Sequence, residues 1–246
     1  MKPPSTRPDY GVDAPGVIRN LFLFGTICLV LGLTLSRQQH LFGNVTLDGR
    51  GLLWPAGFLL GEGLLFVLYV KVGKFRHRDK MLAMHTWRGD EQVLDVGCGR
   101  GLLLAGAAKR VPQGHATGID VWSNVDMGGN SAEATTHNLQ LEGLLDRTTL
   151  LSVPAQEMTF PDGAFDVIVS NLCLHNIYDR PTRMKALHQI VRVLKPGGMA
   201  LISDYKLTGE YAKEFRQAGL LVEKKRGNIL TTFPPLTVVV ARKRLG

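Results

Sequence analysis

Two long apolar stretches near the N-terminus constrain this chain more than any other feature. The first covers about residues 17–35 and, after Arg19 and one asparagine, runs for fifteen residues without a charge. The second covers residues 52–70 and carries a single charge, Glu62. A helix needs about 20 apolar residues to cross the roughly 30 Å hydrocarbon core of a bilayer. Residues 17–72 are therefore predicted to form a hairpin of two transmembrane helices.

A cleaved signal peptide and a pair of buried helices in a soluble protein are the alternatives. A signal peptide needs a cleavage site with small residues, and the stretch at 35–40, Leu-Ser-Arg-Gln-Gln-His, is a poor one. The membrane hairpin is the favoured interpretation. Glu62 is costly inside a bilayer and is expected to face protein. Its neighbours Gly61 and Gly63 favour a helix contact over a proton path.

The distribution of charge indicates which side of the membrane each segment occupies. The chain has 29 Lys and Arg against 21 Asp and Glu, a net charge of +8, and residues 1–90 hold 11 of the basic and 6 of the acidic residues. Residues 71–80 have five basic residues and one acidic residue, whereas the loop at 36–51 has two and one. Because Lys and Arg stay on the cytoplasmic side, the tail at 1–16 and the region after residue 72 are both expected there. The basic segment either sets this topology alone or also attracts anionic membrane lipids.

The three cysteines, Cys28, Cys98 and Cys173, are widely spaced and form no Cys-x-x-Cys pair. A disulfide framework or a thiolate zinc site is therefore not expected. Their usage favours a reducing compartment. No spacing of His, Cys and carboxylates predicts a bound metal.

From about residue 75 onward, short apolar runs alternate with helical patterns, which is typical of a parallel sheet covered by helices. The expected fold of residues 75–246 is α/β, a doubly wound, mostly parallel, seven-stranded Rossmann-like sheet. Strands are predicted at 92–96, 115–119, 148–153, 165–170, 198–204, 221–226 and 236–241. Helices are predicted at 76–87, 101–110, 131–142, 182–194 and 209–218.

A glycine-rich turn follows the first of these strands. Such a turn lets the backbone approach a ligand closely. The spacing is Gly-x-Gly-x-Gly, and position 102 is Leu where a dinucleotide fingerprint has its third glycine. Asp95 lies two residues before the first glycine, where its carboxylate would repel a pyrophosphate and attract a cation. The residues expected to bind the ligand here are Asp95, Gly97, Cys98, Gly99 and Gly101. An Asp that only supports a tight turn is the structural alternative.

With these motifs, the region 75–246 resembles the class I S-adenosylmethionine-dependent methyltransferases, in the small-molecule branch that includes quinone and sterol C-methyltransferases. The resemblance implies S-adenosylmethionine as methyl donor. The stretch 117–122 matches the end of the family's second strand, which implies ribose binding by Asp120 and cofactor contacts from Val121 and Trp122. Trp122 would stack on adenine or serve ordinary packing, and both roles stay open. Residues 192–198 resemble the family's turn from helix into strand five.

One segment departs from the family pattern. Where relatives usually have Gly-Asp-Ala, this chain has Val-Pro-Ala at 153–155. The acid that would hold the adenine amino group is therefore missing. Adenine contact is expected to rest on the Ala155 backbone and on Gln156, and the sequence does not specify the effect of Pro154 on cofactor affinity.

The stretch 170–179 should leave the fourth strand at the mouth of the methyl-transfer site. His175 is the predicted general base because imidazole titrates near neutral pH. The alternative is a structural His175 paired with Asp179 or with backbone. Asn171 is expected to orient the acceptor or the donor, and Tyr178 is a further catalytic candidate, with Tyr205 of similar rank.

The acceptor is predicted to be small and lipophilic, for instance a quinone, a lipid or a hydrophobic thiol. The helix at 76–87 and the segment 228–235 should form the pocket walls close to the bilayer. Basic residues in the second half do not interleave with aromatic ones, so nucleic acid is not an expected partner. A non-catalytic membrane-tethered nucleoside-binding module and a nicotinamide-dependent reductase are the competing functions. The sequence specifies neither the acceptor atom nor the oligomeric state.

Overall fold

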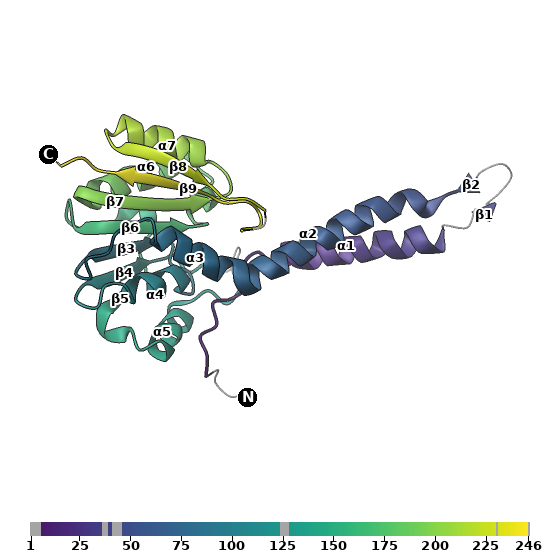
Figure 1. Ribbon diagram of the computed structural model, residues 1–246, viewed down its shortest axis with the longest axis horizontal. Coiled ribbons are helices and arrows are strands. Elements are labelled where there is room, and N and C mark those ends of the chain that lie inside the picture. The colour runs from purple at the N-terminus through teal and green to yellow at the C-terminus, as the bar shows by residue number, and fades with distance from the viewer. Residues whose placement is uncertain (1–5, 36–38, 41–45, 124–127, 230, 246) are drawn as a thin grey trace.

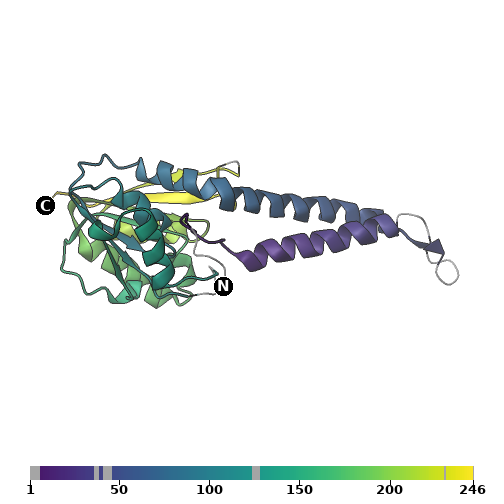
Figure 2. The ribbon, with the colours of Figure 1, turned by 90° about the horizontal axis from the view of Figure 1, so that it is seen from below.

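The structure is a computed structural model that describes residues 6–35, 39–40, 46–123, 128–229 and 231–245. It consists of an α/β domain and a long helical hairpin that projects from it (Figures 1 and 2). The hairpin comprises α1 (Pro15–Thr34) and α2 (Leu53–Leu68), which begins after a 3-10 turn at Gly49–Leu52. The two-residue strands β1 (Gln39–His40) and β2 (Thr46–Leu47) pair antiparallel at the far tip.

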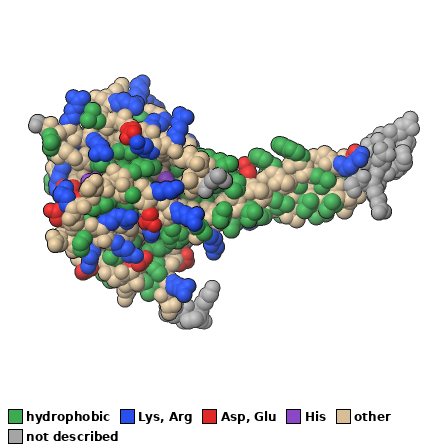
Figure 3. All heavy atoms as spheres, viewed as in Figure 1, with side chains coloured by type: hydrophobic (Ala, Val, Ile, Leu, Met, Phe, Trp, Pro, Cys, Tyr) green, Lys and Arg blue, Asp and Glu red, His purple; other side chains and the backbone are tan. Residues whose placement is uncertain are grey.

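The two hairpin helices pack through glycines that bring their backbones close together. A Cβ atom added to Gly25 would lie 2.9 Å from Cγ of Leu60, and one added to Gly32 would lie 2.7 Å from Cδ2 of Leu53. The remaining faces are mostly uncovered, since only 11% of the most apolar window of each helix is buried. Figure 3 shows hydrophobic side chains along this projecting arm. Both helices are long and apolar enough to cross a membrane.

The second hairpin helix does not end where the sequence predicts. It continues through a π-helical turn at Tyr69–Gly73 into α3 (Lys74–Leu82), so that one helix runs from Gly49 to Leu82. The predicted separate helix at 76–87 is wrong at both ends. No proline or capping side chain interrupts the first boundary. At the second, the chain turns away after Leu82, whose carbonyl accepts a 2.8 Å hydrogen bond from Trp87 Nε1.

The central sheet has seven strands in the order β5-β4-β3-β6-β7-β9-β8. Neighbours are parallel from β5 to β7, while β9 runs antiparallel to both β7 and β8. The prediction of a doubly wound, mostly parallel sheet is confirmed. The strands are β3 (Gln92–Val96), β4 (His115–Ile119), β5 (Thr148–Leu151), β6 (Phe165–Asn171), β7 (Leu194–Asp204), β8 (Leu221–Arg226) and β9 (Thr237–Arg242).

Helices cover both faces of the sheet and bury two separate apolar layers. One layer contains buried side chains of α3, α4 (Leu102–Ala108) and α5 (Ala132–Leu141). The other contains those of α6 (Arg180–Val193) and α7 (Thr208–Gln217). Strand order reverses between β3 and β6, and a crevice for ligands forms at the carboxyl ends of strands at such a point.

Candidate active site

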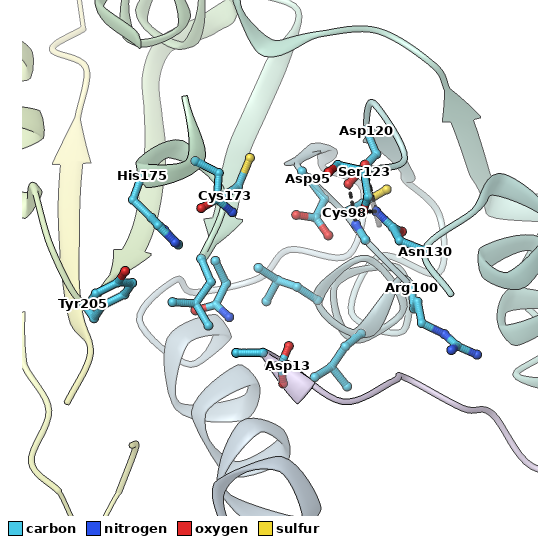
Figure 4. A pocket seen from close by; sticks show the side chains of 18 of the residues that line it. Asp13, Asp95, Cys98, Arg100, Asp120, Ser123, Asn130, Cys173, His175 and Tyr205 are labelled. Carbon is cyan, nitrogen blue, oxygen red and sulfur yellow. Dashed lines mark hydrogen bonds between the residues drawn. The ribbon is translucent and has the colours of Figure 1, made fainter. Parts of the chain in front are cut away.

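A cavity of about 830 Å³ lies at this switch point and extends to the base of the hairpin. Its walls come from the N-terminal segment, the end of α2, α3, the glycine-rich turn after β3 and the loop after β6. Phe233 and Pro234, from the segment before β9, and His77 and Met81, from α3, contribute to the same walls. Figure 4 shows Asp95 and Asp120 on one side of the cavity and His175 and Tyr205 on the other.

The glycine-rich turn forms one end of the cavity. Gly97 has φ +71°, and a Cβ atom there would lie 2.2 Å from Sγ of Cys173, so only glycine fits. The backbone N–H groups of Gly97 and Cys98 donate to the Ile119 carbonyl at 2.8 and 3.1 Å. Gly99 lines the cavity next to them, whereas Gly101 is the N-cap of α4 and lies outside the lining residues that the structure describes.

Asp95, in β3 just before this turn, is buried without a counter-charge. Its side chain is 1% exposed, and its Oδ2 atom has no hydrogen-bond partner within the described ranges. Burial, followed by the negative charge of Asp120, raises the pKa of Asp95 to about 8. An ionised carboxylate in such a place needs a cationic partner. The site therefore suits a positively charged ligand and disfavours a pyrophosphate.

Asp120 follows β4 directly and also lines the cavity. Its Oδ2 atom accepts from the Gly99 N–H at 2.8 Å, and Oδ1 accepts from the Trp122 N–H at 2.6 Å and from Asn130 Nδ2 at 3.2 Å. A carboxylate offers about four lone-pair sites, so it can still accept a ribose hydroxyl. Val121 lines the cavity.

Trp122 makes packing contacts in the structure. Its Nε1–H donates to Ser152 Oγ at 2.7 Å, and its ring packs against the buried layer under α4. Trp122 is not among the described residues that line the cavity. The segment that departs from the family pattern does line it, through Val153, Pro154, Ala155 and Gln156.

His175 is paired with a carboxylate that sequence reasoning missed. Its Nδ1 atom lies 2.9 Å from Oδ1 and 3.1 Å from Oδ2 of Asp204, which is fully buried at the end of β7. Asp204 also accepts hydrogen bonds from the Tyr205 N–H at 2.8 Å and the Tyr211 hydroxyl at 3.2 Å. Because the carboxylate accepts the Nδ1–H proton, Nε2 is left as the basic nitrogen. Asp179 instead caps α6, accepting from the Thr182 N–H at 2.8 Å.

The loop that carries His175 is fixed by a buried arginine. Arg183 donates to the Ile177 carbonyl at 2.6 Å and to Glu210 at 2.8 Å. Tyr178, which follows, lines the cavity but is 78% exposed. It therefore lies at the rim.

The two cavity cysteines are poor nucleophiles. Burial, the largest cause for each, raises the pKa of both the Cys98 and Cys173 thiols. The thiols therefore stay protonated near neutral pH. Among the residues described, no group of three or more His, Cys, Asp or Glu side chains could hold a metal ion.

The N-terminal segment reaches the cavity, which the sequence did not predict. The Lys74 ammonium group, 5% exposed, donates to the carbonyls of Tyr10 at 2.9 Å and Gly11 at 2.6 Å and lies 3.4 Å from Asp13 Oδ2. Burial lowers the pKa of Lys74, and Asp13 opposes this effect. Tyr10 and Asp13 line the cavity as a result. No sequence pattern signals a contact between residues so far apart.

Comparison with known proteins agrees with this geometry. A family model described as a methyltransferase domain matches residues 94–202. This stretch contains the glycine-rich turn, Asp120 and the loop with His175.

Curated relatives are about one third identical to this chain over the aligned residues. A demethylmenaquinone methyltransferase from Listeria monocytogenes is 34% identical over 153 residues, which is 61% of this chain and 57% of that protein. A ubiquinone/menaquinone biosynthesis C-methyltransferase from Vibrio campbellii is 34% identical over 119 residues, 48% of this chain and 42% of that protein. The chain thus spans only about half the length of these relatives.

A solved structure shows the same fold. A SAM-dependent methyltransferase from Aquifex aeolicus superposes with a TM-score of 0.54 at 22% identity, covering 67% of this chain and 88% of that one. The shared part corresponds in extent to the α/β domain without the hairpin.

Proposed function

We propose that this protein is a membrane-anchored methyltransferase that moves a methyl group from S-adenosylmethionine to a small lipophilic acceptor. One observation carries the proposal. A single cavity joins an uncompensated buried carboxylate, Asp95, to the His175–Asp204 pair and to the base of an apolar hairpin. The names of the curated relatives make a quinone the first acceptor to test.

The residues of the donor side fit S-adenosylmethionine. When bound, this molecule supplies a methyl group on a positively charged sulfur. Asp95 offers the negative charge that a sulfonium or ammonium group needs. Asp120 offers acceptor sites for ribose hydroxyls, and the apolar Val121, with the Ala155 and Gln156 turn, offers a place for adenine. A nicotinamide dinucleotide would bring its pyrophosphate to the same carboxylates, which disfavours the reductase alternative.

The acceptor side can hold a nucleophile and receive its proton. Transfer forms a bond between the acceptor atom and the methyl carbon, breaks the bond from that carbon to sulfur, and releases one proton from the acceptor. His175 is placed to take that proton on Nε2, while buried Asp204 stabilises the resulting imidazolium ion. The cavity holds the reactants together, which contributes much of the rate enhancement in a displacement of this kind.

The hairpin supports a membrane location. Its apolar side chains are largely uncovered by protein, as expected for helices in lipid and not for helices in a soluble core. The basic residues at 71–80 lie just beyond the second span and favour a cytoplasmic position for the catalytic domain. The cavity then opens near the bilayer surface, where a lipophilic acceptor would be concentrated.

Calorimetric titration of the full chain with S-adenosylmethionine and with NADH tests the donor assignment. Binding of S-adenosylmethionine alone is expected. The Asp95→Asn variant should lose most of this affinity, whereas Asp90→Asn should keep it because Asp90 is an exposed residue paired with Arg88. Binding of NADH alone would refute the proposal.

A further inference from the structure

Two buried polar atoms on the acceptor side of the cavity have no role in the account given so far. They are the hydroxyl oxygen of Tyr69 and the Oδ1 atom of Asn171, and neither forms a hydrogen bond of normal geometry in the described chain. Both residues line the cavity. Asp95 has the same combination of burial, cavity lining and a missing partner, and a bound donor would satisfy it. Since buried polar groups are almost always hydrogen-bonded, Tyr69 and Asn171 also point to a ligand.

The two atoms approach each other from separate parts of the fold. Tyr69 comes from the end of the second hairpin helix and is 4% exposed, and Asn171 is the last residue of β6. The Asn171 side chain lies beside both the Tyr69 hydroxyl and the His77 ring. His77 already has a partner, because its Nε2 atom lies 2.7 Å from Ser203 Oγ.

The helix itself is irregular at this place. A π-helical turn spans Tyr69–Gly73, and such turns are rare and frequent at functional sites. The Tyr69 ring packs closely against Gly73, where an added Cβ atom would lie 2.9 Å from Cδ2 of the ring. This packing fixes the direction of the hydroxyl group.

The residues around Tyr69 and Asn171 favour a ligand with an aromatic ring that carries a hydroxyl group. A tyrosine hydroxyl donates or accepts, and a carboxamide oxygen accepts. One ligand hydroxyl group can therefore accept a hydrogen bond from Tyr69 and donate one to Asn171. Around them lie Phe66 and Phe233, whose ring centroids are 5.1 Å apart, and Leu172. These apolar groups suit the body of an aromatic molecule.

We propose that Tyr69 and Asn171 form a subsite for a hydroxyl oxygen of the acceptor, a phenol or hydroquinone. This inference rests on the proposed function and narrows its acceptor class. The second hairpin helix then supplies part of the acceptor site as well as an anchor. The bound oxygen would lie in the cavity that also contains His175, which can accept the proton that the ring loses.

Equilibrium binding to the full chain in lipid nanodiscs tests the subsite without relying on turnover. The protein is saturated with S-adenosylhomocysteine under anaerobic conditions. The probes are a short-chain prenylated 1,4-naphthohydroquinone and the corresponding 1,4-naphthoquinone, which has the same heavy atoms but cannot donate a hydrogen bond. We expect the wild type to prefer the hydroquinone by about tenfold, as one or two hydrogen bonds would provide.

Tyr69→Phe and Asn171→Ala should each remove most of this preference, and Tyr69→Phe should leave S-adenosylmethionine affinity unchanged. Leu68→Ala is the matched control, because Leu68 is the neighbouring helix residue and is 56% exposed on the outside. If Tyr69 and Asn171 only support the fold, the variants would lower the melting temperature and keep the preference. That result, or a wild type without any preference, would overturn the subsite. A wild type that binds no S-adenosylmethionine would instead refute the proposed function.

Discussion

The affinity for S-adenosylmethionine should depend on pH through Asp95. Burial, followed by the negative charge of Asp120, raises the pKa of this carboxyl from 3.8 to about 8. That rise corresponds to a cost of about 6 kcal/mol for ionising Asp95 in the folded protein. The donor's positive charge favours the ionised form, so binding should release a proton below pH 8.

The size of the effect follows from the ionised fraction. With a pKa of about 8, roughly one Asp95 in a hundred is ionised at pH 6 and roughly one in ten at pH 7. The association constant should therefore rise about tenfold from pH 6 to pH 7 and level off above about pH 8. The stability of the free protein should change in the opposite sense, falling as pH rises from about 4 to about 8, because the folded state holds this proton more tightly than the unfolded state does.

Isothermal titration calorimetry in buffers of different ionisation enthalpy measures both the affinity and the released proton. Asp95→Asn should bind weakly and lose the pH dependence assigned to the carboxyl, while Asp90→Asn should behave as the wild type. An affinity that stays constant from pH 6 to pH 8, with no proton released, would show that Asp95 does not face the donor's charge.

Three further predictions concern the acceptor side and the N-terminal segment. His175→Gln should slow methyl transfer by about 100-fold with unchanged donor affinity, as measured by single-turnover kinetics, whereas His188→Gln on the exposed face of α6 should not; equal rates in both would exclude a base at His175. Asp204→Asn should also slow transfer and should move the rate's pH profile, because the carboxylate no longer stabilises the imidazolium ion, and an unmoved profile would leave Asp204 a structural role only. Lys74→Met should leave the Tyr10 and Gly11 carbonyls without their hydrogen-bond donor, and it should weaken the binding of S-adenosylmethionine by about tenfold. Amide hydrogen exchange in the N-terminal segment should become faster, and unchanged exchange would refute this anchoring.

The sequence predicted the sheet well because hydrophobic periodicity is a local property. Buried strands such as β3 and β4 have the bounds that their apolar runs indicate. The glycine-rich turn was equally visible, since the spacing of glycines after a strand is set by local backbone geometry. The end of α3 was missed because no capping residue marks it: the helix ends at Leu82, whose carbonyl accepts a hydrogen bond from the Trp87 indole.

The sequence predicted candidate site residues only where they lie close together along the chain. His175 and Asn171 come from a single loop with a recognisable motif. The residues beside them come from other elements: Asp204 reaches His175 because β7 lies beside β6, and Tyr69 comes close to Asn171 because the hairpin helix docks on the sheet. Such pairs depend on strand order and helix placement, which a single sequence does not encode in any short pattern.

Transfer of a labelled methyl group into a lipid phase tests the central claim most directly. The full chain is placed in vesicles that contain the short-chain prenylated naphthohydroquinone, and S-adenosylmethionine with a radiolabelled methyl group is added outside. The account predicts label in the organic extract, on a product heavier by one methylene unit, and its loss in Asp95→Asn. Label that appears only on water-soluble acceptors, or none above the Asp95→Asn background, would contradict it.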